Sequence, residues 1–278
     1  MRPSETKMLS IIIVSFNARD DLARCLNSLH TPAPSTPHEI IVVDNASSDG
    51  SADEARHVAG VRVIDAGGNL GFARGNNLGI RASQGDLLLL LNSDTVVAPG
   101  AVDRLVQILG GVPDVAVLGP RLVNDAGRLE LSFGPMMSPF GELRQKLLVR
   151  GHEAGVPVIR RLVETLASRP RFPDWVSGAC LLVRRADALA VGLLDERYFM
   201  YAEDVDFCAA IRARGRRILF TPDVTVVHRR GQSGLSDRVA TGAAYRRSQV
   251  AFYDKHHPRW APLLRLYLRL RGIQPGRP

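Results

Sequence analysis

Apolar runs alternate with amphipathic segments through the first half of the chain. Strands are predicted at 9–15, 39–44, 61–65, 87–91 and 115–118, and helices at 20–29, 53–58, 71–83 and 101–110. The first helix illustrates the pattern, because Leu22, Cys25, Leu26 and Leu29 recur at the spacing of one helical face. This alternation predicts an α/β fold with a doubly wound, mostly parallel sheet and right-handed crossovers.

The second half of the chain is less regular. Residues 134–174 form an irregular, basic segment in which helices are expected near 142–149 and 158–168. Further elements are expected as a strand at 175–185, a helix at 203–214 and a strand at 217–228 that is broken by Thr221-Pro222. We therefore predict one domain over 1–250, followed by a basic helical tail over 251–278.

The strand predicted at 87–91 ends in Asn92-Ser93-Asp94. Its leucines are typical of a strand that is buried on both faces of a parallel sheet. Ligands of open α/β sheets bind at the carboxyl ends of such strands. Asp94 would suit a hard divalent cation, and a cation there would suit phosphate oxygens. An ordinary turn made by these three side chains is the alternative.

Two other predicted strands also end in polar residues, namely Ser15-Phe16-Asn17 and Asp44-Asn45. Asp44 could accept the N3–H of a pyrimidine, Phe16 could pack on its ring, and Ser15 or Asn17 could bond to a carbonyl. The turn 71–77 could present backbone N–H groups to a diphosphate, although its glycine spacing is that of neither a dinucleotide-binding loop nor a Walker loop. A capping or turn role for Asp44 is the open alternative.

Length and composition indicate a globular protein. The chain has 278 residues, of which 45% are hydrophobic, so it can bury a sizeable core. Its apolar runs fall far short of the roughly 20 residues that span a bilayer, and the N-terminus has no signal-peptide core. We therefore expect a cytoplasmic protein. Cys25, Cys180 and Cys208 are widely scattered, which predicts buried free thiols.

The net charge of +8 requires an explanation. No recognition helix, zinc finger or RNP motif accompanies it, so nucleic acid is not expected as a partner. Beyond Asp254 there is no carboxylate side chain, and Leu263, Leu266, Tyr267 and Leu270 fall at helical spacing with Arg265 and Arg269 on another face. An amphipathic helix on an anionic membrane surface fits this pattern, which would place the protein at the inner face of the cytoplasmic membrane. A C-terminal helix docked on its own domain fits it equally well.

Five segments together resemble the family 2 glycosyltransferases, which have a GT-A fold. They are Val-Asp-Asn-Ala-Ser-Ser-Asp-Gly-Ser (43–51), Asn-Leu-Gly-Phe-Ala-Arg-Gly-Asn-Asn (69–77), Asn-Ser-Asp (92–94), Trp-Val-Ser-Gly-Ala (175–179) and Tyr-Ala-Glu-Asp-Val-Asp (201–206). The likeness covers roughly 9–233 and is strongest to bacterial rhamnosyltransferases that use dTDP-L-rhamnose. It implies a nucleotide-binding half like a Rossmann fold, acceptor-side helices and a C-terminal helical extension.

The resemblance also implies a divalent metal and a donor site. Family members hold Mn²⁺ or Mg²⁺ on the donor diphosphate with Asp-x-Asp, whereas this chain has Asn92 at the first position and keeps Asp94 at the last. His228 matches a histidine metal ligand of related enzymes; a structural strand-end histidine is the alternative. From the polar strand ends and the resemblance together, the expected nucleotide-sugar contacts are Ser15, Phe16, Asn17, Asp44, Asn45, Gly71, Asn76, Asn92 and Ser93.

Glu203-Asp204 matches the family's catalytic carboxylates. Asp204 is the predicted base, while Glu203 and Asp206 would orient it or bind sugar hydroxyls. Acidic residues that only cap a helix N-terminus would give the same pattern. Trp175 and Gly178 are implied on the acceptor side, and the basic residues of 134–174 could contact a lipid diphosphate or headgroups, or could be solvated helix faces.

The sequence thus predicts an inverting, metal-dependent glycosyltransferase of cell-envelope glycan synthesis. It would move a sugar, L-rhamnose from dTDP-L-rhamnose by resemblance, to a hydroxyl of a lipid-linked or polysaccharide glycan acceptor. UDP-hexoses or GDP-mannose are alternative donors. A sugar nucleotidyltransferase and a non-catalytic binding module are the alternative classes of protein. The oligomeric state is not determined, and a homodimer stays open.

Overall fold

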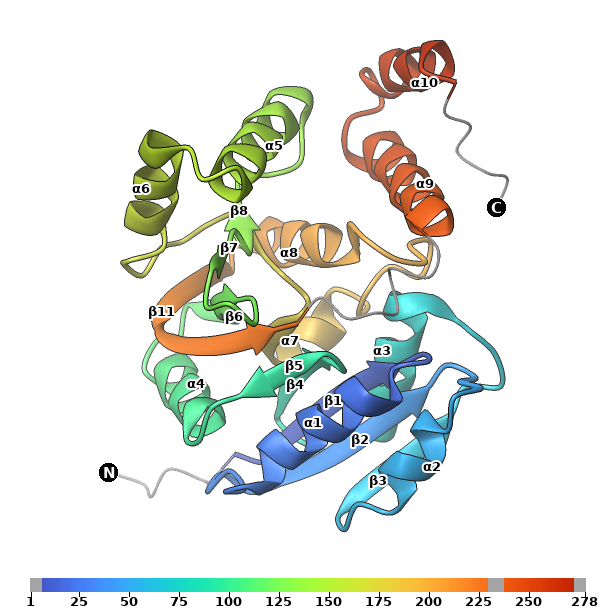
Figure 1. The fold of residues 1–278 in the computed structure, drawn as a ribbon, viewed down its shortest axis with the longest axis vertical. Helices are drawn as coiled ribbons and strands as arrows, with labels where there is room; N and C mark the ends of the chain where they lie inside the picture. The colour runs from blue at the N-terminus through green and yellow to red at the C-terminus, as the bar shows by residue number, and fades with distance from the viewer. Residues whose placement is uncertain (1–6, 230–237, 273–278) are drawn as a thin grey trace.

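A computed structural model describes residues 7–229 and 238–272 of the protein, which form a mixed nine-stranded sheet covered by helices (Figure 1). The strands are β1 (Leu9–Ser15), β2 (His38–Asp44), β3 (Val61–Asp65), β4 (Leu87–Asn92), β5 (Thr95–Val97), β6 (Val115–Val123), β7 (Leu129–Glu130), β10 (Cys180–Arg184) and β11 (Arg217–His228). β8 (Phe133–Gly134) and β9 (Trp175–Val176) pair separately. The helices are α1 (Arg19–His30), α2 (Ser51–Arg56), α3 (Gly71–Ala82), α4 (Ala101–Gly110), α5 (Pro139–Glu153), α6 (Pro157–Leu166), α7 (Arg185–Ala190), α8 (Glu203–Ala213), α9 (Arg238–His256) and α10 (Ala261–Leu270).

The first half of the sheet is parallel, as the alternating pattern predicts. β1 lies between β2 and β4 and pairs with both in parallel, and β3 extends the sheet beside β2. In this register Ser15 lies opposite Asp44, and Val14 lies opposite Asn92. The polar ends of β1, β2 and β4 therefore meet at one edge of the sheet.

The second half of the sheet is mixed, in order β4-β10-β6-β11-β5. β10 is antiparallel to β4 and β6, β11 runs parallel to β6, and β5 is antiparallel to β11. The strand expected at 175–185 is split into β9 and β10 around Gly178. The break expected at Thr221-Pro222 is instead an irregularity within β11, which stays one strand with a register shift between Thr221 and Thr225.

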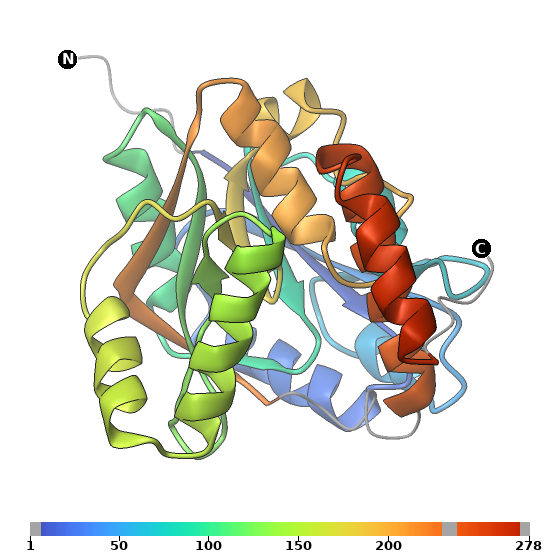
Figure 2. The same ribbon diagram turned by 90° about the horizontal axis from the view of Figure 1, so that it is seen from above.

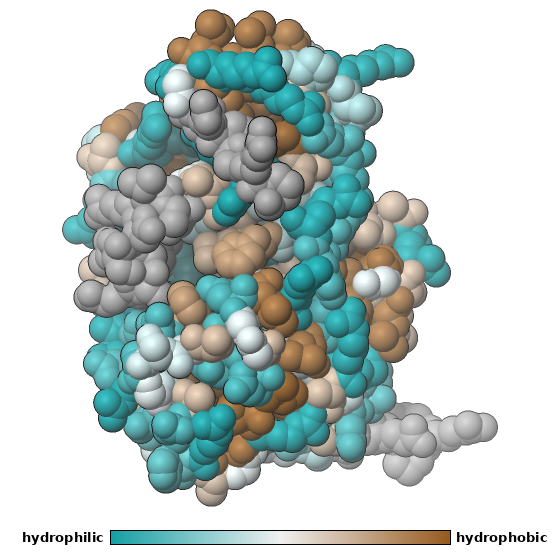
Figure 3. Space-filling model, turned by 90° about the vertical axis from the view of Figure 1, so that its right-hand side faces the viewer, coloured by the Kyte–Doolittle hydropathy of each residue, from teal (hydrophilic) through white to brown (hydrophobic). Residues whose placement is uncertain are grey.

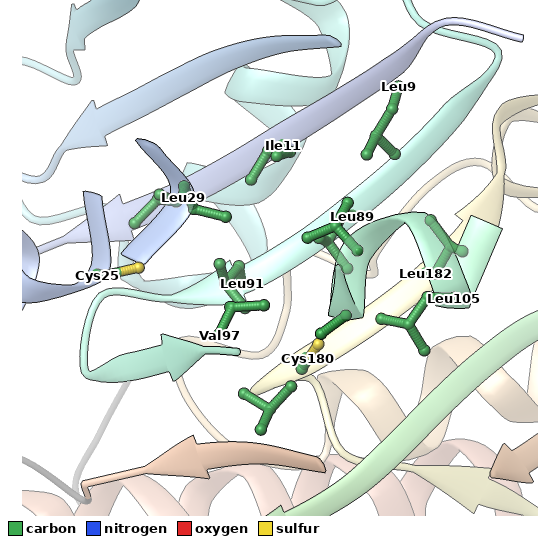
Figure 4. Close-up of a cluster of buried hydrophobic side chains, with 14 of the residues drawn as sticks. Leu9, Ile11, Cys25, Leu29, Leu89, Leu91, Val97, Leu105, Cys180 and Leu182 are labelled. Carbon is green, nitrogen blue, oxygen red and sulfur yellow. The ribbon is translucent and has the colours of Figure 1, made fainter. Parts of the chain in front are cut away.

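The core has two parts because successive residues of a strand point to opposite faces of the sheet. Ile11, Ile13, Leu89 and Leu91 pack on one face against α1, α2 and α4, a cluster that Figure 4 shows in part. Their neighbours Ile12, Leu88 and Leu90 pack on the other face with α3, α7 and α8. The leucines of 87–91 are at most 3% exposed, which matches a strand buried on both faces.

All three cysteines are buried free thiols, as predicted. Cys25 and Cys180 belong to the cluster in Figure 4, and Cys208 lies on the opposite face of the sheet. Burial raises the pKa of Cys25 and of Cys208 to about 12, so both thiols stay protonated.

The C-terminal helices pack on the domain. The predicted boundary at 250 lies inside α9, which runs without a break to His256. Phe252 and Tyr253 of α9 and Ala261 of α10 form a third core cluster with Tyr198, Ala202 and Val205. Residues 273–278 of the predicted tail lie outside the described residues. No helix within 7–229 or 238–272 combines the length and the apolar composition needed to cross a membrane.

Candidate active site

The ends of β2 and β3, at Asp44 and Asp65, line a polar hollow of about 470 Å³ together with residues 46–48 and the start of α2. Asp44 is 4% exposed and accepts a hydrogen bond from the Ser47 N–H at 3.0 Å through Oδ2. Its Oδ1 and the Ser15 hydroxyl are buried without a hydrogen-bond partner among the described residues. Asp44, which lines the hollow, therefore offers an acceptor oxygen to a ligand, whereas the Ser15 hydroxyl lies next to β2 and is fully buried.

Phe16 and Asn17 lie next to this hollow and differ in what they contact. Phe16 is 40% exposed, which leaves its ring open to stacking. Asn17 has a φ of 47°, and its Oδ1 accepts a hydrogen bond from the Ser48 N–H at 2.8 Å. Asn17 thus shapes the loop that follows β2 as well as lying at the predicted site.

The Gly71 turn is held against the second half of the chain. Gly71 has a φ of 79°, and a Cβ at this position would overlap the carbonyl of Phe199. The Gly71 carbonyl accepts a hydrogen bond from the Asn45 side chain at 3.2 Å. Asn76 donates to the Phe72 carbonyl, while its own Oδ1 is buried and unpartnered among the described residues. The turn therefore requires glycine for its close approach to residue 199.

The end of β4 faces the end of β11. His228 Nε2 lies 3.4 Å from Asp94 Oδ1 and 3.4 Å from Asn92 Nδ2, so residues 136 positions apart converge here. The other ring nitrogen, Nδ1, lies 3.0 Å from Glu130 Oε2. Among the described residues no group of three or more His, Cys, Asp or Glu side chains is arranged as a complete metal site.

Asp94 and His228 nevertheless fit a shared cation. A carboxylate oxygen and an imidazole nitrogen are both ligands of first-row divalent metals, and their 3.4 Å separation allows both to contact one ion. Glu130 would then act on the second ring nitrogen, as a carboxylate does behind many metal-bound histidines. The predicted pair therefore fits part of a metal site, which a donor diphosphate would have to complete.

The pKa of His228 is raised above the ordinary value of a histidine when no metal ion is bound. Burial alone would lower its pKa, but hydrogen bonds and charges of Asp94 and Glu130 outweigh burial and raise the pKa to about 9. The imidazole is thus held between two carboxylates as a cation at neutral pH.

The two predicted catalytic carboxylates open α8. Asp204 Oδ2 accepts a hydrogen bond from the Gly178 N–H at 2.9 Å, and its Oδ1 accepts one from the Val205 N–H at 2.8 Å. Glu203 is 6% exposed, and its Oε2 has no partner among the described residues. Backbone N–H groups thus hold both carboxylate oxygens of Asp204, whereas one oxygen of the Glu203 carboxyl is buried without a partner among the described residues.

These different surroundings affect the pKa values of the two carboxyl groups differently. Burial and the charge of Asp204 raise the pKa of Glu203 well above its ordinary value. Burial also raises the pKa of Asp204, but the backbone N–H groups of Gly178 and Val205 oppose that rise. Of the two neighbours, Asp204 is therefore the one that is more readily ionised, and Glu203 is the one that keeps its proton.

One cavity of about 310 Å³ connects the start of α8 with His228 and Glu130. Its wall includes Glu203 and Asp204 from α8, Trp175 from β9, His228 from β11 and Glu130 from β7. Helix α5 contributes Gly141, Glu142, Gln145 and Lys146, and α9 contributes Tyr245. The irregular segment 134–174 and the C-terminal helix thus both reach the site.

The acceptor-side residues occupy different positions. Trp175 lines the cavity and donates its indole N–H to the Pro135 carbonyl at 2.8 Å. Gly178 lies against Phe72 and Asp204. Asp206 does not line this cavity; it is 2% exposed and contacts Lys255 at 2.8 Å and His256 at 2.6 Å. In the structure Asp206 therefore anchors α9 to α8.

Two further residues were not found from the sequence. Glu130 belongs to the two-residue strand β7, which has no periodic pattern to mark it. Asn77 adjoins the predicted Asn76, and its side chain binds both backbone groups of Leu194 at 2.8 and 3.1 Å. Two adjacent asparagines within the helix predicted at 71–83 were the one available signal for Asn77, and α3 buries both.

Comparisons with known proteins agree with this geometry. Residues 10–162 match the model of the family described as Glycosyl transferase family 2. The chain belongs to glycosyl transferase family 2. It is 32% identical to the N-acetylglucosaminyl-diphospho-decaprenol L-rhamnosyltransferase of Mycobacterium tuberculosis, over 95% of this chain and 90% of that protein. It is 28% identical to rhamnosyltransferase WbbL of Escherichia coli K12, over 80% of this chain and 83% of that protein.

Solved structures share the fold of this family 2 enzyme. The mannosyltransferase PcManGT of Pyrobaculum calidifontis, in complex with GDP-Man and Mn²⁺, matches with a TM-score of 0.64 over 95% of this chain and 69% of that chain, at 18% identity. S. aureus TarS 1-349 with UDP-GlcNAc matches with a TM-score of 0.55 over 81% of this chain and 60% of that chain, also at 18% identity. The predicted family, GT-A fold and glycosyltransferase activity are thereby confirmed.

Proposed function

We propose that this family 2 enzyme transfers L-rhamnose from dTDP-L-rhamnose to a hydroxyl of a lipid-linked glycan, with inversion at the anomeric carbon. Two relatives with high coverage of this chain are named rhamnosyltransferases, and the name of one includes a diphospho-decaprenol acceptor. The observation that carries the proposal is the single cavity whose wall holds both Asp204 and His228. A base and a diphosphate-binding group on one cavity are what a single displacement requires.

The donor would lie along the ends of β1, β2 and β4. The free Oδ1 of Asp44 is suited to a nucleobase, and the exposed ring of Phe16 is suited to stacking on it. The diphosphate would extend toward Asp94 and His228, past Asn92 and Ser93. Asp94 and His228 would hold a divalent cation, Mn²⁺ or Mg²⁺, that offsets charge on the departing diphosphate.

The acceptor would enter from the side of α5 and Trp175. Its hydroxyl oxygen forms a bond to the anomeric carbon while the bond from that carbon to the diphosphate oxygen breaks. Asp204 takes the hydroxyl proton, and the nucleoside diphosphate leaves with the bonding electron pair. Glu203 stays protonated beside Asp204, so the two neighbours do not carry two negative charges in one buried place.

A donor screen tests the substrate. Purified protein would be offered dTDP-L-rhamnose, UDP-glucose, UDP-N-acetylglucosamine or GDP-mannose with a polyprenyl-diphosphate N-acetylglucosamine acceptor, with and without Mn²⁺. We expect nucleotide release to be fastest with dTDP-L-rhamnose and to depend on the cation. Preference for another donor would replace rhamnose in the proposal, and no transfer from any donor would reject the proposed function.

Asp94→Ala tests the metal assignment. Calorimetry with Mn²⁺ present should show weakened binding of dTDP, because a single carboxylate in a metal site cannot be lost without a large cost. Asp125→Ala, which removes an exposed carboxylate outside both cavities, is the control. Unchanged dTDP affinity and unchanged turnover in Asp94→Ala would reject Asp94 as a ligand.

A further inference from the structure

Helix α5 has two distinct faces. The cavity-lining residues of α5 are Gly141, Glu142, Gln145 and Lys146. Phe140, Leu143 and Leu147 point away from the cavity and are 77%, 57% and 58% exposed. An amphipathic helix normally buries its apolar residues, so this exposed apolar stripe indicates an interaction surface.

Helix α10 presents a second apolar stripe. Ala261 and Leu268 are buried on the side that packs on the domain. Leu263, Leu266 and Leu270 are 56%, 52% and 80% exposed on the opposite side. The sequence left two alternatives for the C-terminal helix, docking on the domain and a free apolar face. The structure contains both, because one side of α10 packs on the domain and the opposite side is apolar and exposed.

The two stripes lie at the same end of the molecule. Figure 1 shows α5 and α10 at the upper end, Figure 2 looks down on both helices from that end, and Figure 3 shows hydrophobic atoms at its top edge. Phe140 at the start of α5 contacts Trp260 just before α10, with ring centroids 6.5 Å apart. His257 also approaches the Met137 carbonyl, with 2.7 Å between Nε2 and O. These contacts join the stripes into one surface, which we call the α5–α10 face; its apolar members are Phe140, Leu143, Leu147, Leu263, Leu266 and Leu270.

Basic residues flank the α5–α10 face. Arg144, Arg150, Arg259 and Arg269 form no ion pair with any residue that the structure describes. Helix α10 has no acidic side chain, and the outward carboxylate of α5, Glu153, lies at its far end. A second copy of the chain on this face would oppose arginines with arginines, which is unfavourable. An anionic lipid surface instead offers hydrocarbon to the leucines and phosphate to the arginines.

We propose that the α5–α10 face rests on an anionic lipid bilayer and brings the mouth of the active-site cavity to the headgroups. Helix α5 would then border the bilayer through Leu143 and Leu147 and the wall of the cavity through Gln145 and Lys146. A lipid-linked acceptor could reach Asp204 while its hydrocarbon chain stays in the membrane. The access of a lipid-linked acceptor to Asp204 rests on the proposed function. The binding of the α5–α10 face to a bilayer does not.

Vesicle sedimentation tests the face with a matched pair of variants. Leu266 and Leu189 are 52% and 54% exposed, and Leu189 lies on α7, away from the face. With vesicles of phosphatidylcholine and phosphatidylglycerol, Leu266→Gln should weaken binding about fivefold and Leu189→Gln should leave it unchanged. The triple variant L143Q/L266Q/L270Q should weaken binding by more than about tenfold. Circular dichroism and thermal melting would verify that each variant folds.

The charge contribution has its own test. Arg144→Gln with Arg269→Gln should weaken binding to anionic vesicles and should flatten its decrease with rising salt. Equal binding of the wild type and the triple variant would overturn the proposal. So would self-association of the wild type that the triple variant abolishes, because the face would then be an interface between copies.

Failure of the face and failure of the proposed function can be distinguished. Transfer to a short-chain, water-soluble acceptor analogue should be the same in the wild type and the triple variant. Normal transfer without vesicle binding by the wild type would reject the face alone. Vesicle binding without transfer from any donor would reject the proposed function and leave the face in place.

Discussion

Glu130 Oε2 lies 3.0 Å from His228 Nδ1, across 98 positions of sequence. The opposite ring nitrogen of His228 points toward Asp94. This arrangement fixes the plane of the imidazole and selects which nitrogen faces the proposed cation. Glu130 would thereby be a positioning residue for the proposed metal site.

Glu130→Gln should weaken Mn²⁺-dependent binding of dTDP by about 10- to 100-fold. A glutamine keeps the size of the side chain but removes the charge that makes the imidazole a better ligand. Calorimetry with and without Mn²⁺ measures the effect, and dTDP binding in the absence of metal is the internal control. An equal loss in both conditions would indicate a structural role for Glu130.

Asp204→Asn should lower turnover by about 10² or more while dTDP affinity is retained. An amide cannot take the acceptor proton. It also offers one acceptor oxygen where the carboxylate receives two backbone N–H groups, so the variant should be assayed well below its melting temperature. Glu203→Gln, which mimics a protonated carboxyl, should lose less than about tenfold. If Glu203→Gln loses more than Asp204→Asn, the base is Glu203.

Glu203 should make the protein less stable as pH rises. Its pKa is raised in the folded state, so above pH 4.5, its ordinary pKa, the unfolded chain releases a proton that the folded chain retains. The contribution to stability is full below that pH and is lost progressively up to the folded pKa. The melting temperature of Glu203→Gln relative to wild type should therefore increase between about pH 5 and pH 8. A constant difference across this range would show that Glu203 is ionised in the folded protein.

Asp206→Asn should destabilise the fold by about 2 kcal/mol, because it removes the charge that Lys255 and His256 contact. Asp254→Asn is the control, since its ion pair with Arg265 is exposed and should contribute less than about 1 kcal/mol. Urea unfolding measures both. Donor and acceptor kinetics of Asp206→Asn should stay near wild type, and a large rise in KM for the acceptor would favour the sugar-binding role predicted from the sequence.

The sequence by itself determined the parallel half of the fold and the polar strand ends. Alternation of apolar runs with amphipathic segments is a local property, and the strand at 87–91 is buried on both faces as its composition predicts. Once parallel strands are expected, Ser15, Asp44 and Asn92 must lie at one edge of the sheet. The family motifs then identified the glycosyltransferase.

Only the tertiary structure decided what surrounds these residues. Glu130 contacts His228 from a two-residue strand. Asp206, which looks like part of the catalytic motif, instead binds the side chains of Lys255 and His256, 49 and 50 positions away. The amphipathic pattern of 260–270 was compatible with docking and with a free apolar face, and the structure contains both. Contacts between distant segments depend on how whole elements pack, and no local periodicity encodes them.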